Sequence, residues 1–214
     1  MIEMTDDLIE SIAFVGETLG PFYLQDPKTG DAGPAYQALA AIDVDVAAEE
    51  WPFVEDAEAQ ADLSLMKQGL VCGHEDDAVV WEYRRLLVGP ATKPAPPWGS
   101  VYTDRECVVF GESTLTLRQW MREKGIARLD DDKTPEDHIG LMLLLMAWIA
   151  RYRPELLDDY LRLHVLTWSS HFLSQFAEAA EQPFFEGLAC LTKESLEGIR
   201  VARGLAVDYP RFYR

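Results

Sequence analysis

The residues best suited to chemistry in this 214-residue sequence are an adjacent aspartate and histidine, Asp137 and His138. A carboxylate that orients an imidazole beside a serine hydroxyl can support hydrolysis, with Ser100 or Ser113 as the nucleophile. The spacing argues against this, because neighbouring residues of a helix point about 100° apart. The sequence also lacks the G-x-S-x-G turn of many hydrolases. No catalytic residue is therefore predicted.

Histidines and cysteines are too dispersed to indicate a metal site. The sequence has no HExxH motif and no histidine pair four residues apart, although His164 and His171 are seven apart. Cys72, Cys107 and Cys190 form no CxxC motif and are expected to be free thiols in a reducing compartment. No GxxxxGK[ST] loop is present either, so nucleotide binding is only weakly motivated. We predict no metal, no cofactor and no enzymatic activity.

The charge balance is strongly acidic, with 19 Lys plus Arg against 37 Asp plus Glu and a net charge of −18. Such a field repels nucleic acid and anionic membrane surfaces and favours cationic partners, although solubility alone also explains acidity. The first ten residues, MIEMTDDLIE, contain neither a basic stretch nor an apolar one. They do not resemble an export signal, so a cytoplasmic location is expected.

Apolar residues recur three and four positions apart through most of the chain, which predicts an all-α fold. With 48% hydrophobic residues, one domain over residues 1–214 can bury a sizeable core. We expect a bundle of about nine or ten helices, near residues 5–19, 34–41, 56–68, 75–87, 114–124, 135–151, 155–166, 168–180, 183–191 and 192–205.

Several residues mark where these helices should begin and end. Gly20-Pro21 and Gly89-Pro90 are predicted to stop the first and fourth, because proline cannot continue the backbone hydrogen bonding. Ser113 is suited to an N-cap, and Gly125 to a left-handed C-cap. Between the fourth helix and Ser113, residues 88–112 are rich in proline and glycine and form a loop long enough to suggest a functional role.

The segment from Thr134 onward predicts a central helix. Thr134 is a candidate cap, Pro135 fits the first helical position, and Asp137 fits the third, where an acid can complete a capping box. IGLMLLLMAWIA follows, twelve residues without a charge. A membrane span needs about 20 apolar residues, so this helix is expected to be buried on all sides rather than inserted in a membrane.

Three motifs give the sequence a family resemblance: YRRLLVGP, PAPPWGSVYTDRE and FGESTLTLRQWMREKG. A fourth, TPEDHIGLMLLLMAWIA, is similar to a Glu-Pro-x-Asp-His signature, with Thr134 in place of the usual glutamate. Together they resemble the TorD/DmsD/NarJ chaperones, and the DmsD branch most strongly. Resemblance is clear over residues 81–150, continues less closely to the C-terminus, and is only general over the first 75 residues.

The resemblance implies a TorD-like helical fold that binds the twin-arginine leader of a DMSO-reductase-like molybdoenzyme. Its partners would be that leader and the apo-form of the enzyme's catalytic subunit, with the export machinery as a further candidate. Export would wait until the cofactor is inserted and the enzyme is folded. A NarJ-like assembly factor that acts on the body of a cytoplasmic subunit is the alternative. Both a monomer and a domain-swapped dimer are open.

The resemblance also implies which residues bind the leader. They combine aromatic and aliphatic surface with a carboxylate, which suits arginines followed by an apolar stretch. The residues are Tyr83, Leu86, Leu87, Pro97, Trp98, Tyr102, Asp137 and His138. From pattern alone, the first three could simply be core, the Pro97-Trp98 pair a rigid turn, and Asp137 a helix cap.

Overall fold

Every regular element of the described residues is helical, which confirms the predicted fold class. The computed structural model describes residues 5–89, 92–127 and 134–214, and these contain eleven α-helices, two π-helical turns, one 3-10 turn and no strand. Two of the α-helices have only four residues. The elements are α1 (Asp6–Leu24), α2 (Gly33–Ala41), α3 (Val44–Glu50), α4 (Asp56–Gly69), α5 (Asp77–Tyr83), η1 (Arg84–Val88), α6 (Ser100–Thr103), α7 (Glu112–Glu123), α8 (Ile139–Tyr152), η2 (Pro154–Leu156), α9 (Leu157–Tyr160), η3 (Leu161–Val165), α10 (Ser169–Ala179) and α11 (Pro183–Ala202).

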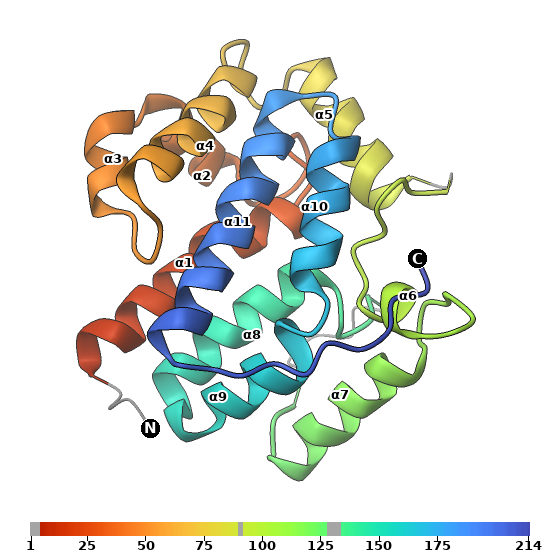
Figure 1. The fold of residues 1–214 in the computed structure, drawn as a ribbon. Coiled ribbons are helices and arrows are strands. Elements are labelled where there is room, and N and C mark those ends of the chain that lie inside the picture. The colour runs from red at the N-terminus through yellow and green to blue at the C-terminus, as the bar shows by residue number, and fades with distance from the viewer. Residues whose placement is uncertain (1–4, 90–91, 128–133) are drawn as a thin grey trace.

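The α1 and α8 helices pack closely against each other near the middle of the molecule (Figure 1). Gly16 and Gly20 of α1 face α8, and a methyl group at Gly16 would clash with the carbonyl oxygen of Leu143. At Gly20 a methyl group would press on the side chain of Leu144. The two backbones therefore approach at a distance that only glycine allows, and this contact sets the position of the α8 start.

The prediction that α8 is buried on all sides is only partly correct. Ile139, Leu143 and Met146 have no exposed surface, but Trp148 is 41% exposed and Tyr152 is 67% exposed. The rings of Trp148 and Tyr152 lie 5.7 Å apart on the outer side of the helix. Aromatic pairing on that side lets α8 carry apolar residues at a solvent-facing position. None of the described helices has the length and apolarity that crossing a membrane requires.

The α11 helix packs against α4 and α10 and closes the core from the other side (Figure 1). Two helices, 183–191 and 192–205, were predicted here, and the structure instead has one continuous helix. Thr192, at the expected break, donates its hydroxyl to the carbonyl oxygen of Leu188 and lies 3.0 Å from the hydroxyl of Tyr23. A threonine satisfied in this way need not end a helix.

Other helix ends differ from prediction where tertiary packing outweighs local preference. The α1 helix continues past Gly20-Pro21 to Leu24, because its last turn buries Phe22 and Tyr23 in the core. The short α3 and α6 helices were not predicted. Gly125 follows α7 with φ +70°, as expected of a left-handed C-cap. Pro90, which was predicted to end the fourth helix, lies outside the described residues.

Two of the predicted helices, 75–87 and 155–166, end in π-helical turns, η1 and η3. In η1 the amide of Gly89 donates to the carbonyl of Arg84, and in η3 the amide of Leu166 donates to the carbonyl of Leu161. Each bond spans five residues instead of four. Beyond η3, Trp168, Phe172 and Phe176 form the predicted row, with ring centroids 5.5 and 5.4 Å apart.

Candidate functional site

The proline-rich loop is held against the start of α8 by a set of backbone contacts. Ile139 donates its amide to the carbonyl of Pro97 (2.9 Å), and Gly99 donates to the carbonyl of Asp137 (3.2 Å). The Asp137 carboxylate accepts a hydrogen bond from the amide of Ser100 (2.8 Å). Five of the eight predicted site residues, in segments far apart in sequence, therefore lie in one region.

This arrangement replaces the predicted capping box. The α8 helix begins at Ile139, and its N-cap is His138, whose Nδ1 accepts from the amide of Gly140 (3.2 Å). Asp137 stands before the helix, and its carboxylate bonds to the loop instead of to Thr134 or the α8 amides. Likewise α7 begins at Glu112, before the predicted cap Ser113, since the carboxylate of Asp104 accepts from the Glu112 amide (2.9 Å).

Trp98 and His138 pair across the two segments. They form an isolated antiparallel bridge, and their rings meet edge to face with centroids 5.7 Å apart. His138 is buried, Trp98 is half-buried, and the Lys93 ammonium lies 5.6 Å from the centre of the Trp98 ring. By accepting this hydrogen bond at Nδ1, the His138 ring helps to fix the backbone at the start of α8.

Burial and hydrogen bonding act in opposite directions on the Asp137 carboxyl. Desolvation raises the pKa of Asp137 above its ordinary value, while the Ser100 amide and the nearby hydroxyls of Ser100 and Thr114 partly offset the rise. The other carboxylate oxygen, Oδ1, makes no hydrogen bond of normal distance and angle, although the Ser100 and Thr114 hydroxyls lie near the carboxylate. A cationic group that approached Oδ1 would favour the ionised form and supply the missing partner.

Several other buried polar atoms around Asp137 also lack partners, and such groups are uncommon in folded proteins. Those that make no hydrogen bond of normal geometry are the indole nitrogen of Trp98, Nε2 of His164, and the hydroxyls of Ser100, Tyr102, Ser113 and Thr114. For His164, burial lowers the pKa to about 4, so the imidazole is neutral at pH 7. Water or a ligand with hydrogen-bonding groups would satisfy these atoms.

Asp137 and His164 line a cavity of about 270 Å³, here called the site cavity, which lies between α7, η3 and the segment that follows α11. Three carboxylates, Asp137, Glu112 and Asp208, border it, and none of the described residues that line it is a lysine or arginine. The cavity is thus suited to a positively charged, hydrogen-bonding group. Its remaining lining residues are Thr103, Ser113, Thr116, Leu117, Met142, Leu163, Thr167, Trp168 and Pro210.

Tyr83, Leu86 and Leu87 occupy a different place, at the end of α5 and in η1. Their side chains are 2%, 0% and 4% exposed, and the Tyr83 ring lies 6.5 Å from that of Phe185 in α11. Burial raises the pKa of Tyr83, so its phenol stays neutral. These three side chains are part of the core, and their contact with a leader stays a prediction.

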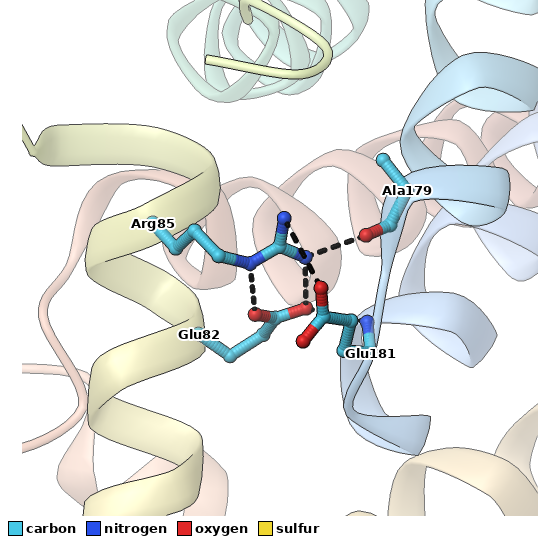
Figure 2. Close-up of polar contacts among 4 residues, drawn as sticks. All are labelled: Glu82, Arg85, Ala179 and Glu181. Carbon is cyan, nitrogen blue, oxygen red and sulfur yellow. Dashed lines mark hydrogen bonds and ion pairs between the residues drawn. The ribbon is translucent and has the colours of Figure 1, made fainter. Parts of the chain in front are cut away.

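An ion pair beside them joins α5 and η1 to the end of α10 (Figure 2). The Glu82 carboxylate, 3% exposed, accepts bonds from Arg85 Nε (2.6 Å) and Nη2 (2.8 Å) and from the amide of Glu181 (2.6 Å). Arg85 also donates to the carbonyl of Ala179 (2.5 Å). These contacts pair the buried charge of Glu82. The region around Asp137 has no comparable ion pair to its carboxylate among the described residues.

Sequence reasoning missed two parts of this picture. His164 was considered only as a metal ligand, although His164 and Trp168 are four apart and face one cavity. A second, more apolar cavity of about 680 Å³ lies between α1, α2 and α3, beside Phe14 and Trp51, where the sequence offered no motif. Within the described ranges no group of three or more His, Cys, Asp or Glu residues is placed to hold a metal ion.

Comparison with known proteins agrees with the family resemblance that the motifs indicate. The family described as nitrate reductase delta subunit matches residues 55–179. The Tat proofreading chaperone DmsD of Salmonella paratyphi A is 39% identical over 188 residues, which cover 87% of this chain and 88% of that protein. The probable Tat proofreading chaperone DmsD of Haemophilus influenzae is 41% identical over 167 residues, covering 78% and 80%.

A more distant relative, the chaperone protein TorD of Shewanella piezotolerans, is 24% identical over 149 residues, covering 64% of this chain and 69% of that protein. The family match covers more than half of this chain, and the relatives align with most of it. The chain therefore belongs to the nitrate reductase delta subunit family of chaperones, which confirms the resemblance drawn from the motifs.

Proposed function

We propose that this protein is a maturation chaperone that binds the twin-arginine leader of a DMSO-reductase-like molybdoenzyme in the cytoplasm. It delays export of the apo-form until cofactor insertion and folding are complete. The observation that carries the proposal is the acidic site cavity, which the carboxylates of Asp137, Glu112 and Asp208 border. The names of the relatives, Tat proofreading chaperones, support it.

The mechanism is occupancy without bond making. An arginine side chain of the leader enters the site cavity, and its guanidinium pairs with the Asp137 carboxylate, a geometry that favours bidentate contact. Trp98, which is half-buried, supplies an aromatic face on which a second guanidinium or an apolar side chain can rest. Tyr102 is fully buried against Trp168 and Phe172, so it supports the site from behind. His138 and Pro97 keep the loop and the α8 start in register.

The first test is titration calorimetry of the purified protein with a synthetic twin-arginine leader of a DMSO-reductase-type enzyme. A matched peptide with both arginines changed to alanine is the control. We expect micromolar or tighter binding for the leader and a loss of at least about tenfold for the control, since two charge-assisted contacts are removed. Equal binding of both peptides would exclude arginine recognition.

The alternative, a NarJ-like assembly factor, has a distinct signature. Such a protein would bind the apo-form of a molybdoenzyme subunit from which the leader has been removed, and would ignore the isolated leader. Titration with both probes therefore separates the two functions.

A further inference from the structure

The residues that follow α11 run as an extended segment across one face of the molecule. Residues 205–214, here called the strap, leave the end of α11, pass α9 and the base of α10, and finish beside α6 (Figure 1). An ion pair between Arg203 and Asp158 (2.9 Å) fixes the point where the strap departs. The strap has no regular secondary structure of its own.

The far end of the strap is attached by a few specific contacts. Tyr213 donates its amide to the carbonyl of Tyr102 (2.9 Å), and Arg214 Nη2 donates to the carbonyls of Lys93 (2.8 Å) and Pro94 (3.2 Å). Phe212 stacks on the His171 ring with centroids 4.1 Å apart and planes 2° from parallel. A backbone bond, an arginine and an aromatic ring thus hold the strap over the loop.

The strap also separates two cavities. Asp208 and Pro210 line the site cavity on one side, while Tyr209 and Phe212 line a cavity of about 290 Å³ on the other. Thr167 and Trp168 border both cavities. If the strap lifted away, the two spaces would join into one groove floored by Trp168.

The strap is weakly attached for a segment that lies over two cavities. Tyr209 is 58% exposed and Tyr213 is 42% exposed, and Phe212 is only half-buried. Its charge is opposite to that of the chain, with Arg211 and Arg214 against one aspartate, whereas the whole protein carries −18. Few buried apolar contacts resist displacement, which is typical of segments that open locally.

We propose that the groove beneath the strap, between α6 and α10, binds an extended peptide in which an arginine stands beside an aromatic residue. The strap is its resident occupant, and an incoming leader displaces it. This inference rests on the proposed function for the identity of the incoming peptide. The strap itself shows the chemistry that the groove accepts: arginine on backbone carbonyls, an aromatic ring on His171, and a backbone bond to Tyr102.

Occupancy by the strap lowers the apparent leader affinity in proportion to the fraction of molecules that are covered. Loosening the strap should therefore strengthen leader binding. In the full chain, the double substitution Phe212→Ala and Arg214→Ala removes both side-chain anchors. We expect this variant to bind the synthetic twin-arginine leader about tenfold more tightly than the unmodified protein, corresponding to an unmodified strap that covers about nine molecules in ten.

Arg211→Ala is the matched control, because the Arg211 guanidinium contacts only the ring of Tyr213 within the strap among its described contacts. Its leader affinity should stay within about twofold of the unmodified protein. A second readout uses the unmodified chain: hydrogen exchange of the Tyr213 amide, which is bonded to Tyr102, should speed up when the leader is added. This readout decides the question even if the double variant fails to fold.

A labelled synthetic peptide of residues 208–214, DYPRFYR, tests the groove without any leader. It should bind the double variant and bind the unmodified protein about tenfold more weakly. Binding of this peptide without binding of the leader would leave the groove in place and reject the proposed function. The inference is overturned if the peptide binds neither protein, or if the leader binds while Tyr213 exchange and the affinity of the double variant stay unchanged.

Discussion

Two regions of the molecule contain the predicted leader-binding residues, and they treat buried polar groups differently. Around Tyr83, Leu86 and Leu87 the buried carboxylate of Glu82 accepts three hydrogen bonds from Arg85 and Glu181. Around Asp137 the structure instead buries a carboxylate oxygen, several hydroxyls and an imidazole nitrogen that make no hydrogen bond of normal geometry.

The difference indicates which of the two regions stabilises the fold and which one can bind a partner. A paired buried charge fixes the joint between α5, η1 and α10 and leaves nothing for a ligand to satisfy. Unpaired buried groups cost stability unless water or a ligand completes them, so a fold that keeps them together preserves a place for a partner. We therefore assign stability to the first region and recognition to the second, and four changes test that division.

The largest effect is expected from Glu82→Ala. Removing this partner leaves the Arg85 guanidinium and the Glu181 amide uncompensated, which should lower the free energy of unfolding by about 3 kcal/mol. Leader affinity should stay the same, measured by calorimetry below the unfolding transition. Glu181→Ala is the control: its carboxylate is 79% exposed and 3.8 Å from Arg85, so about 0.5 kcal/mol is expected in urea unfolding.

The next effect is a pH dependence that belongs to the recognition region. Burial lowers the pKa of His164 to about 4, below the ordinary 6.5. In the unfolded chain His164 gains a proton near pH 6.5, whereas in the folded chain it stays neutral until about pH 4. Its contribution to stability is therefore complete above pH 6.5 and is lost as the pH falls towards 4.

His164→Gln should abolish this contribution. Between pH 7 and pH 5 the difference in unfolding free energy between the unmodified protein and the variant should change by about 2 kcal/mol. His171→Gln, a half-buried histidine with hydrogen bonds to Gln175 and Arg214, is a suitable comparison. A pH-independent difference for His164→Gln would mean that this imidazole is solvated in the native state.

Asp137→Asn should separate binding from stability. The asparagine carbonyl can still accept from the Ser100 amide, so the free energy of unfolding should change by less than about 1 kcal/mol. Loss of the charge should weaken leader binding about tenfold. Asp76→Asn, at the α5 N-cap, retains one backbone bond in the same way and should leave leader affinity unchanged. Unfolding without loss of affinity would reverse the assignment of the two regions.

The smallest effect concerns salt. Raising ionic strength from 0.05 to 0.5 M should weaken leader binding about threefold, because partly exposed charges are screened over roughly 10 Å or less. The stability lost in Glu82→Ala should stay the same within about 0.5 kcal/mol, since that pair is largely buried. Salt-independent leader binding would indicate an apolar groove without arginine recognition.

Much of the fold was predictable from the spacing of apolar residues, because helix bodies depend on neighbours three and four positions apart. The helix ends were less predictable where a residue distant in sequence makes the contact that starts or extends the helix. Ser113 is a sound cap by local chemistry, yet Asp104 provides the acceptor that starts α7. Pro21 would end an isolated helix, yet burial of Phe22 and Tyr23 extends α1 past it.

The candidate site, too, was predictable from sequence only in part. Motifs brought together Trp98, Tyr102, Asp137 and His138, because these lie in segments with strong family patterns. His164 could not be chosen from sequence, since its burial depends on packing against Trp120 of α7 and Tyr160 of α9. The strap itself resembles an ordinary polar tail in sequence, and only its contacts with Tyr102 and His171 reveal where it lies.

The π-helical turn η3 has a consequence for how this site could have arisen. A π turn holds one residue more than the α-helical turn it replaces, and such bulges are often found at functional sites. The π turn accommodates the added residue locally, so side chains inside the turn lie about 100° from where an unbroken α-helix would place them. Deleting one residue from Leu161–Val165 would therefore turn His164 relative to α9. A single codon gained or lost there would be enough to create or erase this side of the site cavity.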